Sequence, residues 1–304
     1  MVTVSSTLKD VNGVRVGHDT DARGLTGSTV ILFDEMALTA AEVRGAAPGS
    51  RDIAMLQPGM SNRRADAILL SGGSAYGLRA ADGVMQVLRD RRRGVAIADV
   101  TVPLVPAAVI FDLAVGEVVF PDADAGRRAV ENARPLSRIE SGRIGAGTGA
   151  RLGMILGGER ARAGGFGVAQ VQLQAGTVTA FAVVNALGVL VGESFGAADA
   201  DPRSAFIDAI DSIDLVPEGQ STTLMSVVTD IGCGYDILLR CCVSAHDALA
   251  RTIVPAHTAA DGDIAFASTT REGTITREHA MMLTLATELA MEMAIRNAAS
   301  IPVI

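Results

Sequence analysis

Short apolar runs rich in β-branched residues alternate with long segments of helical periodicity, and this alternation limits the folds open to the chain. The runs predict strands, because branched side chains pack well on a pleated surface. The long segments place apolar residues three and four positions apart, which predicts amphipathic helices. We expect strands at residues 28–33, 67–71, 95–98, 177–191, 223–229 and 263–268, and helices at residues 75–92, 236–254 and 276–298. The pattern predicts an α/β (α+β) protein in which helices cover sheets.

Composition favours one large domain. The chain has 304 residues, of which 49% are hydrophobic and 20% charged, so it can bury a large core without division into smaller units. We therefore expect a single domain over residues 1–304.

Charge and hydropathy predict which partners the protein has. The formal net charge is −8 and only residues 91–93 form a basic run, so we expect no nucleic-acid partner. No apolar stretch is long enough to span a bilayer, and no early segment has the pattern of a signal peptide. A cytoplasmic protein without a membrane partner is expected.

Cysteines and histidines show neither a disulfide framework nor the spacing of a metal site. The three cysteines cluster between residues 233 and 242 and are expected to be buried thiols. The four histidines are His18, His246, His257 and His279. Their positions do not match metal-ligand spacing, so we expect no metal and no cofactor.

A polar pair precedes one of the expected strands and offers a nucleophile. The segment from Gln220 to Asp230 contains Ser221 and Thr222, followed by an apolar run. If the Ser221–Thr222 peptide bond is broken, Thr222 gains a free α-amine with a pKa of about 7.7–8.0 and can act as its own general base. A Thr-rich start of a strand explains the same residues without any chemistry.

Two carboxylates flank a glycine in a second polar segment, residues 255–267. Asp261 and Asp263 fall on one side of an extended chain, where paired carboxylates can hold an amine or hydroxyl and tune its proton affinity. The Asp-Gly dipeptide is equally typical of a tight turn.

Together these segments resemble the self-processing family of L-aminopeptidase/D-amino-acid esterases, β-peptidyl aminopeptidases and nylon-oligomer endohydrolases. The resemblance extends over nearly the whole chain, through ordered segments at residues 14–18, 26–30, 43–49, 70–78, 145–150, 183–188 and 245–251. It implies a four-layer αββα sandwich, the broader fold that the ornithine acetyltransferases share, and it implies a homo-oligomer.

The resemblance also implies roles for individual residues. Thr222 is the expected nucleophile, exposed when the chain cleaves itself between 221 and 222 into a large N-terminal and a small C-terminal fragment. Asn185 is the expected oxyanion donor, although an Asn in a turn between two strands needs no such role. Asp261 and Asp263 match the acidic pair that orients the nucleophile and its amine.

Three positions depart from the family pattern. Ser221 precedes the nucleophile where relatives often have Asn or Gly. Met154 stands where nylon-oligomer hydrolases have a catalytic Lys, and Lys9 is the only lysine of the chain. Phe111 replaces a Tyr of some members and has no hydroxyl to donate. We expect the site to work through the Thr222 amine and the acidic pair, without a lysine.

The expected function is that of an N-terminal-nucleophile hydrolase that cleaves amide bonds in a small peptide, an amide or an amide oligomer. Two alternatives remain open from the sequence. One is a non-catalytic or weakly active relative, in which Met154 and Phe111 mark lost chemistry. The other is an acyltransferase that uses the same Thr with an amine in place of water as acceptor.

Overall fold

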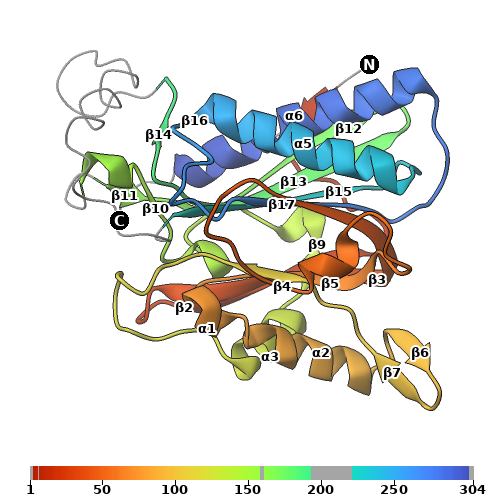
Figure 1. Ribbon diagram of the computed structural model, residues 1–304, viewed down its shortest axis with the longest axis horizontal. Helices are drawn as coiled ribbons and strands as arrows, with labels where there is room; N and C mark the ends of the chain where they lie inside the picture. Colours follow the sequence, from red (N-terminus) through yellow and green to blue (C-terminus); the bar gives the residue numbers. More distant parts are fainter. Residues whose placement is uncertain (1–2, 6, 158–160, 193–220, 301–304) are drawn as a thin grey trace.

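Helices and sheets lie in four layers, with two sheets face to face between two layers of helices (Figure 1). This computed structural model describes residues 3–5, 7–157, 161–192 and 221–300, so Gln220 lies outside the described residues. The strands follow the hydrogen-bonded order β1-β12-β13-β15-β17-β3-β5-β8-β4, with β2 paired to β3 and β9 paired to β2. The arrangement confirms the αββα sandwich expected from the resemblance.

The two faces of the sandwich are built from different parts of the chain. The sheet nearer α5 and α6 contains β1 (Thr3–Ser5), β12 (Gly165–Leu173), β13 (Gly176–Asn185), β15 (Thr222–Thr229) and β17 (Ile264–Thr269). The sheet nearer α2 and α3 contains β2 (Val14–Asp21), β4 (Gly49–Arg51), β5 (Arg64–Ser71), β8 (Ala107–Val109) and β9 (Arg134–Pro135). Short paired strands complete the fold: β6 (Val95–Ile97) with β7 (Val100–Val102), β10 (Arg151–Leu152) with β11 (Arg162–Ala163), and β14 (Val189–Leu190) with β16 (Ile253–Val254).

The long strand β3 (Thr26–Val43) connects the two sheets. Its first part pairs with β2 and β5, and its last part, residues 38–43, pairs with β17. The register with β5 shifts between Leu32 and Ala37, and such an irregularity bends a strand. The predicted strand at residues 28–33 covers only the first part, because the exposed Asp34 and Glu35 interrupt the apolar run.

Three apolar cores separate the four layers. The core between the sheets contains Phe33, Phe166, Phe181 and Phe266, all 0–1% exposed. A second core lies between the β15 sheet and the helices α5 and α6, and a third between β3, β5 and the helices α2 and α3. Every sheet face that meets another layer is therefore apolar. Because the strands are buried on both faces, their sequences are near-continuous hydrophobic runs.

The helices agree with the predicted segments in part. The helices α5 (Tyr235–Thr252) and α6 (Arg277–Ala299) match the predicted segments 236–254 and 276–298 closely, and Thr276 caps α6 by accepting the His279 N–H. The segment predicted as one helix at 75–92 is divided into α1 (Ser74–Gly77) and α2 (Ala80–Asp90), and α3 (Ala123–Glu131) was not predicted. Among the described residues, no helix has the length and apolar character needed to cross a membrane.

Two glycines bring α2 and α3 into backbone contact. A Cβ atom on Gly83 would overlap the Ala123 carbonyl, and one on Gly126 would overlap the Ala80 carbonyl. The two helices therefore touch through reciprocal glycines, which side chains would force apart.

We expect Gly83→Ala to lower the free energy of unfolding by about 1–3 kcal/mol, because the added methyl group separates α2 from α3. Helix propensity alone predicts the opposite sign, a gain of about 1 kcal/mol. Urea unfolding measures the difference, with Gln86→Ala on the exposed face of α2 as the matched control. A Gly83→Ala chain as stable as the control would show that the helices separate without cost.

Candidate functional site

The sequence-predicted site residues come together at the beginning of β15. Thr222 is the first residue of this strand and lies opposite Asn185, the last residue of β13. On the other side, Ser221 lies beside Asp261, just before β15 and β17 begin their parallel pairing. Thr222, Asn185, Asp261 and Asp263 are each at most 3% exposed, so their polar groups must find partners inside the protein.

The carbonyl group of Ser221 is held by two donors. The Thr222 hydroxyl donates to the Ser221 carbonyl oxygen at 2.6 Å, and the Gly262 N–H donates to the same oxygen at 2.9 Å. A backbone N–H aimed at a carbonyl oxygen stabilises the negative charge that develops there when a nucleophile attacks. The hydroxyl of Thr222 and a donor for an oxyanion thus meet at one peptide bond.

Asp263 connects the nucleophile strand to a histidine. Its Oδ1 accepts the backbone N–H of Thr223 at 2.7 Å. Its Oδ2 accepts the backbone N–H of His257 at 3.1 Å and lies 2.9 Å from Nδ1 of the same residue. The carboxylate is thereby fixed in orientation by three contacts.

Asp261 contacts the residue on the other side of the candidate bond. Its Oδ1 accepts the Ser221 hydroxyl at 2.7 Å, and its Oδ2 accepts the Thr258 N–H at 2.7 Å. Burial, followed by the nearby charge of Asp263, raises the pKa of Asp261 above its usual value, and the hydrogen bonds from Ser221 and Thr258 oppose this rise. A carboxylate with a raised pKa is better matched to proton transfer near neutral pH.

Two histidines whose pKa values are shifted in opposite directions lie next to the carboxylates. Burial lowers the pKa of His257, but the hydrogen bond and charge of Asp263 outweigh it, so the net shift is upward. Burial lowers the pKa of His246 to about 4, so this ring is neutral. The His246 Nε2 faces the carbonyl oxygen of Glu42 at 3.1 Å, and the two rings meet edge to face with centroids 4.9 Å apart.

The loop that follows β3 holds the backbone of the acidic segment. The N–H groups of Arg44 and Gly45 donate to the Asp263 carbonyl, and the Ala47 N–H donates to the Asp261 carbonyl. A Cβ atom on Gly45 would overlap the Asp261 carbonyl, so glycine is needed for this close approach. Two segments that carry the family resemblance, residues 43–49 and 255–267, are therefore in direct contact.

Asn185 joins two further segments to the site. Its Oδ1 accepts the Arg151 N–H at 2.9 Å, and its Nδ2 donates to the Phe111 carbonyl oxygen at 3.1 Å. The expected oxyanion role of Asn185 stays a prediction. Behind Phe111, the buried Asp112 accepts hydrogen bonds from the Thr26 hydroxyl and the Gly73 N–H, both at 2.7 Å.

Met154 is placed near the end of β13 by its backbone neighbours. It opens a single 3-10 turn, Met154–Leu156, in which the Ile155 N–H donates to the Leu187 carbonyl at 2.9 Å. The preceding Gly153 N–H donates to the Gly188 carbonyl. Met154 thus lies on a turn attached to the residues that follow Asn185, and its role as a replaced lysine stays a prediction. Lys9 is exposed, and its backbone is tied to the Gln170 side chain on β12.

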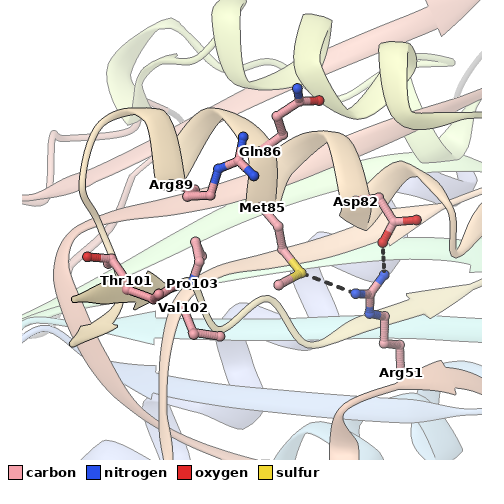
Figure 2. Close-up of a pocket in the computed structure, with 9 residues that line it drawn as sticks. Arg51, Asp82, Met85, Gln86, Arg89, Thr101, Val102 and Pro103 are labelled. Carbon is pink, nitrogen blue, oxygen red and sulfur yellow. Dashed lines mark hydrogen bonds and ion pairs between the residues drawn. The ribbon is translucent and has the colours of Figure 1, made fainter. Parts of the chain in front are cut away.

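A groove of about 480 Å³ elsewhere on the molecule contains none of these residues (Figure 2). It lies between α2 and the β6–β7 hairpin. Arg51 reaches Asp82 at 2.5 Å and the Met85 sulfur at 3.1 Å across this groove. Its charge is therefore paired by the protein itself.

A comparison with known proteins identifies the family. The model for peptidase family S58 matches residues 6–301. The chain belongs to peptidase family S58. This confirms the resemblance inferred from the sequence.

Related sequences include proteins named as aminopeptidases and as amide-oligomer hydrolases. An uncharacterized aminopeptidase of Mycobacterium leprae is 40% identical over 212 residues, covering 64% of this chain and 57% of the relative. A 6-aminohexanoate-oligomer endohydrolase of a Kocuria species is 34% identical over 240 residues, covering 73% of this chain and 63% of the relative. The S58 chain thus spans less than two thirds of the length of these relatives.

Solved structures share the fold. A β-aminopeptidase of a Burkholderia species superposes with a TM-score of 0.72 at 20% identity, over 98% of this chain and 89% of that chain. The L-aminopeptidase D-Ala-esterase/amidase of Ochrobactrum anthropi, described as a variant of the Ntn hydrolase fold, gives a TM-score of 0.72 at 18% identity, over 95% of this chain and 84% of that chain.

Two contributors to the site were not found by sequence reasoning. The Gly262 N–H is a backbone group, which no residue type reveals. For His257, the sequence shows no metal-ligand spacing and indicates no contact with Asp263. Its position six residues before Asp263 in the same polar segment was the available signal, but a loop conformation was needed to bring the two side chains together.

We expect Gly262→Ala to lower the free energy of unfolding by about 1–3 kcal/mol, because its Cβ atom would lie 2.7 Å from both the Thr222 Oγ and the Ala47 carbonyl oxygen. Urea unfolding measures this, with Gly232→Ala as control, since a Cβ atom there meets only ordinary contacts of 3.5 Å or more. Equal stabilities for the two variants would contradict the close packing of Gly262 on Thr222.

Proposed function

We propose that this S58 protein is an amide-bond hydrolase that activates itself by cleaving the Ser221–Thr222 bond. The observation that carries the proposal is the Ser221 carbonyl oxygen held between the Thr222 hydroxyl and the Gly262 N–H. Family membership and the names of the relatives support amide hydrolysis as the reaction class. Under this proposal the described chain is the uncleaved precursor, a single domain before processing.

Processing begins with attack of Thr222 Oγ on the Ser221 carbonyl carbon. The hydroxyl proton passes to a base, and the buried Asp261, which accepts the hydroxyl of the adjacent Ser221, is our candidate for it. The Gly262 N–H stabilises the oxyanion of the tetrahedral intermediate. The C–N bond then breaks, the Thr222 nitrogen takes a proton, and the Ser221 acyl group is left as an ester on Thr222 Oγ. Water hydrolyses the ester, which gives a Ser221 carboxylate and a free Thr222 amine.

The mature site uses the new amine as its base. With a pKa of about 7.7–8.0, the Thr222 amine takes the proton of its own hydroxyl as Oγ attacks the carbonyl carbon of a substrate amide. The acyl group forms an ester on Thr222, the amine product leaves with a proton, and water releases the acid. Asp263 orients the beginning of β15 through the Thr223 N–H.

The substrate class follows from the relatives and not from a pocket. Proteins named as aminopeptidases and as a 6-aminohexanoate-oligomer endohydrolase both act on amide bonds, so we propose a small peptide, amide or amide oligomer as substrate. A panel of chromogenic amides and esters, with and without an added amine as acceptor, separates hydrolysis from acyl transfer.

The homo-oligomer stays a prediction. Four apolar side chains of α6 are exposed in the single chain, at Met281, Met282, Leu285 and Leu289. Light scattering of the purified protein decides the matter, because a mass of 31.3 kDa would exclude an oligomer.

We expect Thr222→Ala to remain one full-length chain, because it has no hydroxyl to attack Ser221. Thr222→Ser keeps a hydroxyl at the same atom and is the matched control, which should still yield two fragments. Intact mass and N-terminal sequencing of wild type and both variants measure this. Appearance of a fragment beginning at residue 222 in purified Thr222→Ala would refute Thr222 as the nucleophile.

A further inference from the structure

His257 is surrounded by oxygen acceptors on both ring nitrogens. Nδ1 faces Asp263 Oδ2 at 2.9 Å, and Nε2 faces the His246 carbonyl oxygen at 3.4 Å. A neutral imidazole carries a hydrogen on only one of its nitrogens, so beside a deprotonated Asp263 it would leave one of these contacts without a donor. Only the imidazolium form donates to both.

The backbone fixes the ring in this place. His257 has a left-handed conformation with φ 59°, and its own N–H donates to Asp263 Oδ2 at 3.1 Å. The same carboxylate holds the Thr223 N–H through Oδ1. A single carboxyl group therefore links the histidine to the residue after the proposed nucleophile.

We propose that His257 is a positioning residue which, as an imidazolium between Asp263 Oδ2 and the His246 carbonyl, holds Asp263 ionised against the Thr223 N–H. It supplies a cation at the site of a chain whose single lysine, Lys9, is tied through its backbone to Gln170 on β12, a strand that does not neighbour β17 in the sheet order. The catalytic part of this inference rests on the proposed self-processing at Thr222.

The charges around His257 agree with this assignment. Asp263 is its anionic partner, and the ring of His246, which packs against it from α5, is neutral. From the end of β3, Arg44 opposes the charge on His257, but Arg44 is itself paired with Glu42 at 2.8 Å. The charged group nearest to His257 is therefore the carboxylate of Asp263.

The pH dependence has a defined sign. The pKa of His257 is raised in the folded protein above its ordinary value of 6.5. The stability that the charged His257 contributes is fully present below pH 6.5. It is lost as the pH rises through the pKa of His257 in the folded protein. Processing should therefore decline on the alkaline side, where the charge-assisted bond to Asp263 becomes an ordinary one.

The first test measures the contact between His257 and Asp263 and does not depend on enzyme activity. In the intact Thr222→Ala chain, the imidazole of His257 and the backbone amide of Thr223 are followed by NMR as pH is raised. We expect His257 to titrate above its ordinary value of 6.5, and the Thr223 amide shift to change with the same midpoint. A His257 that titrates below 6.5, or a Thr223 amide that does not follow it, would overturn the proposal.

The second test measures the role in processing. His257→Asn keeps a donor near the Nδ1 position and suits a positive φ, but it cannot be charged. We expect it to process about tenfold more slowly than wild type at neutral pH and to lack the alkaline decline. His279→Asn is the control and should keep the wild-type profile. An unchanged alkaline decline in His257→Asn overturns the positioning role. If wild type and all variants stay intact, the proposed function fails, while the NMR titration still decides the charged contact.

Discussion

Two carboxylates buried side by side at the head of one strand are the constraint on which the site depends. Asp261 and Asp263 are almost without solvent, and like charges in such a place raise each other's affinity for protons. Each carboxylate has its own hydrogen-bonding partners. The Ser221 hydroxyl and the Thr258 N–H donate to Asp261, whereas the Thr223 N–H donates to Asp263 and the His257 ring contacts it. The result is asymmetric, since Asp263 has the imidazole of His257 as a partner, while burial and the nearby charge of Asp263 raise the pKa of Asp261.

The sandwich makes this arrangement possible by bringing strand ends together. The parallel pairing of β15 and β17 starts at Leu224 and Ile264, so the residues that precede each strand meet at the same edge. On the opposite side, β13 ends where β15 begins, which places Asn185 against Thr222. The bent strand β3 then delivers the loop that holds the backbone of the acidic segment. Apolar cores on both faces of the β15 sheet fix these strands, so the polar groups at their ends have little freedom to move.

Sequence reasoning recovered what periodicity and residue type encode. The C-terminal helix was predicted within one residue at each end, because its apolar spacing is regular and Thr276 is a good cap. The full length of β3 was not predicted. The polar residues Asp34 and Glu35 indicate the end of a strand in the sequence, but in the structure they lie within β3, where its register shifts. Thr222, Asn185, Asp261 and Asp263 were chosen from motifs and do lie together. His257 and the Gly262 N–H were missed, because one depends on a left-handed loop residue and the other on a backbone direction.

The proposed chemistry needs a different base before and after cleavage, and the asymmetry of the two carboxylates accounts for this. In the precursor, the nitrogen of Thr222 belongs to a peptide bond and has no useful basicity, so a side chain must take the hydroxyl proton. Asp261 suits this step because its pKa is raised and it accepts a hydrogen bond from Ser221. After cleavage, the α-amine of Thr222 takes over as base, and the remaining task is to keep it in place beside its own hydroxyl. Asp263 contacts His257 and accepts the Thr223 N–H, one residue from that amine, and under the proposal it favours the correct orientation of the amine. Under the proposed mechanism, the two acids therefore serve successive stages of one site, Asp261 for proton transfer in processing and Asp263 for orientation throughout.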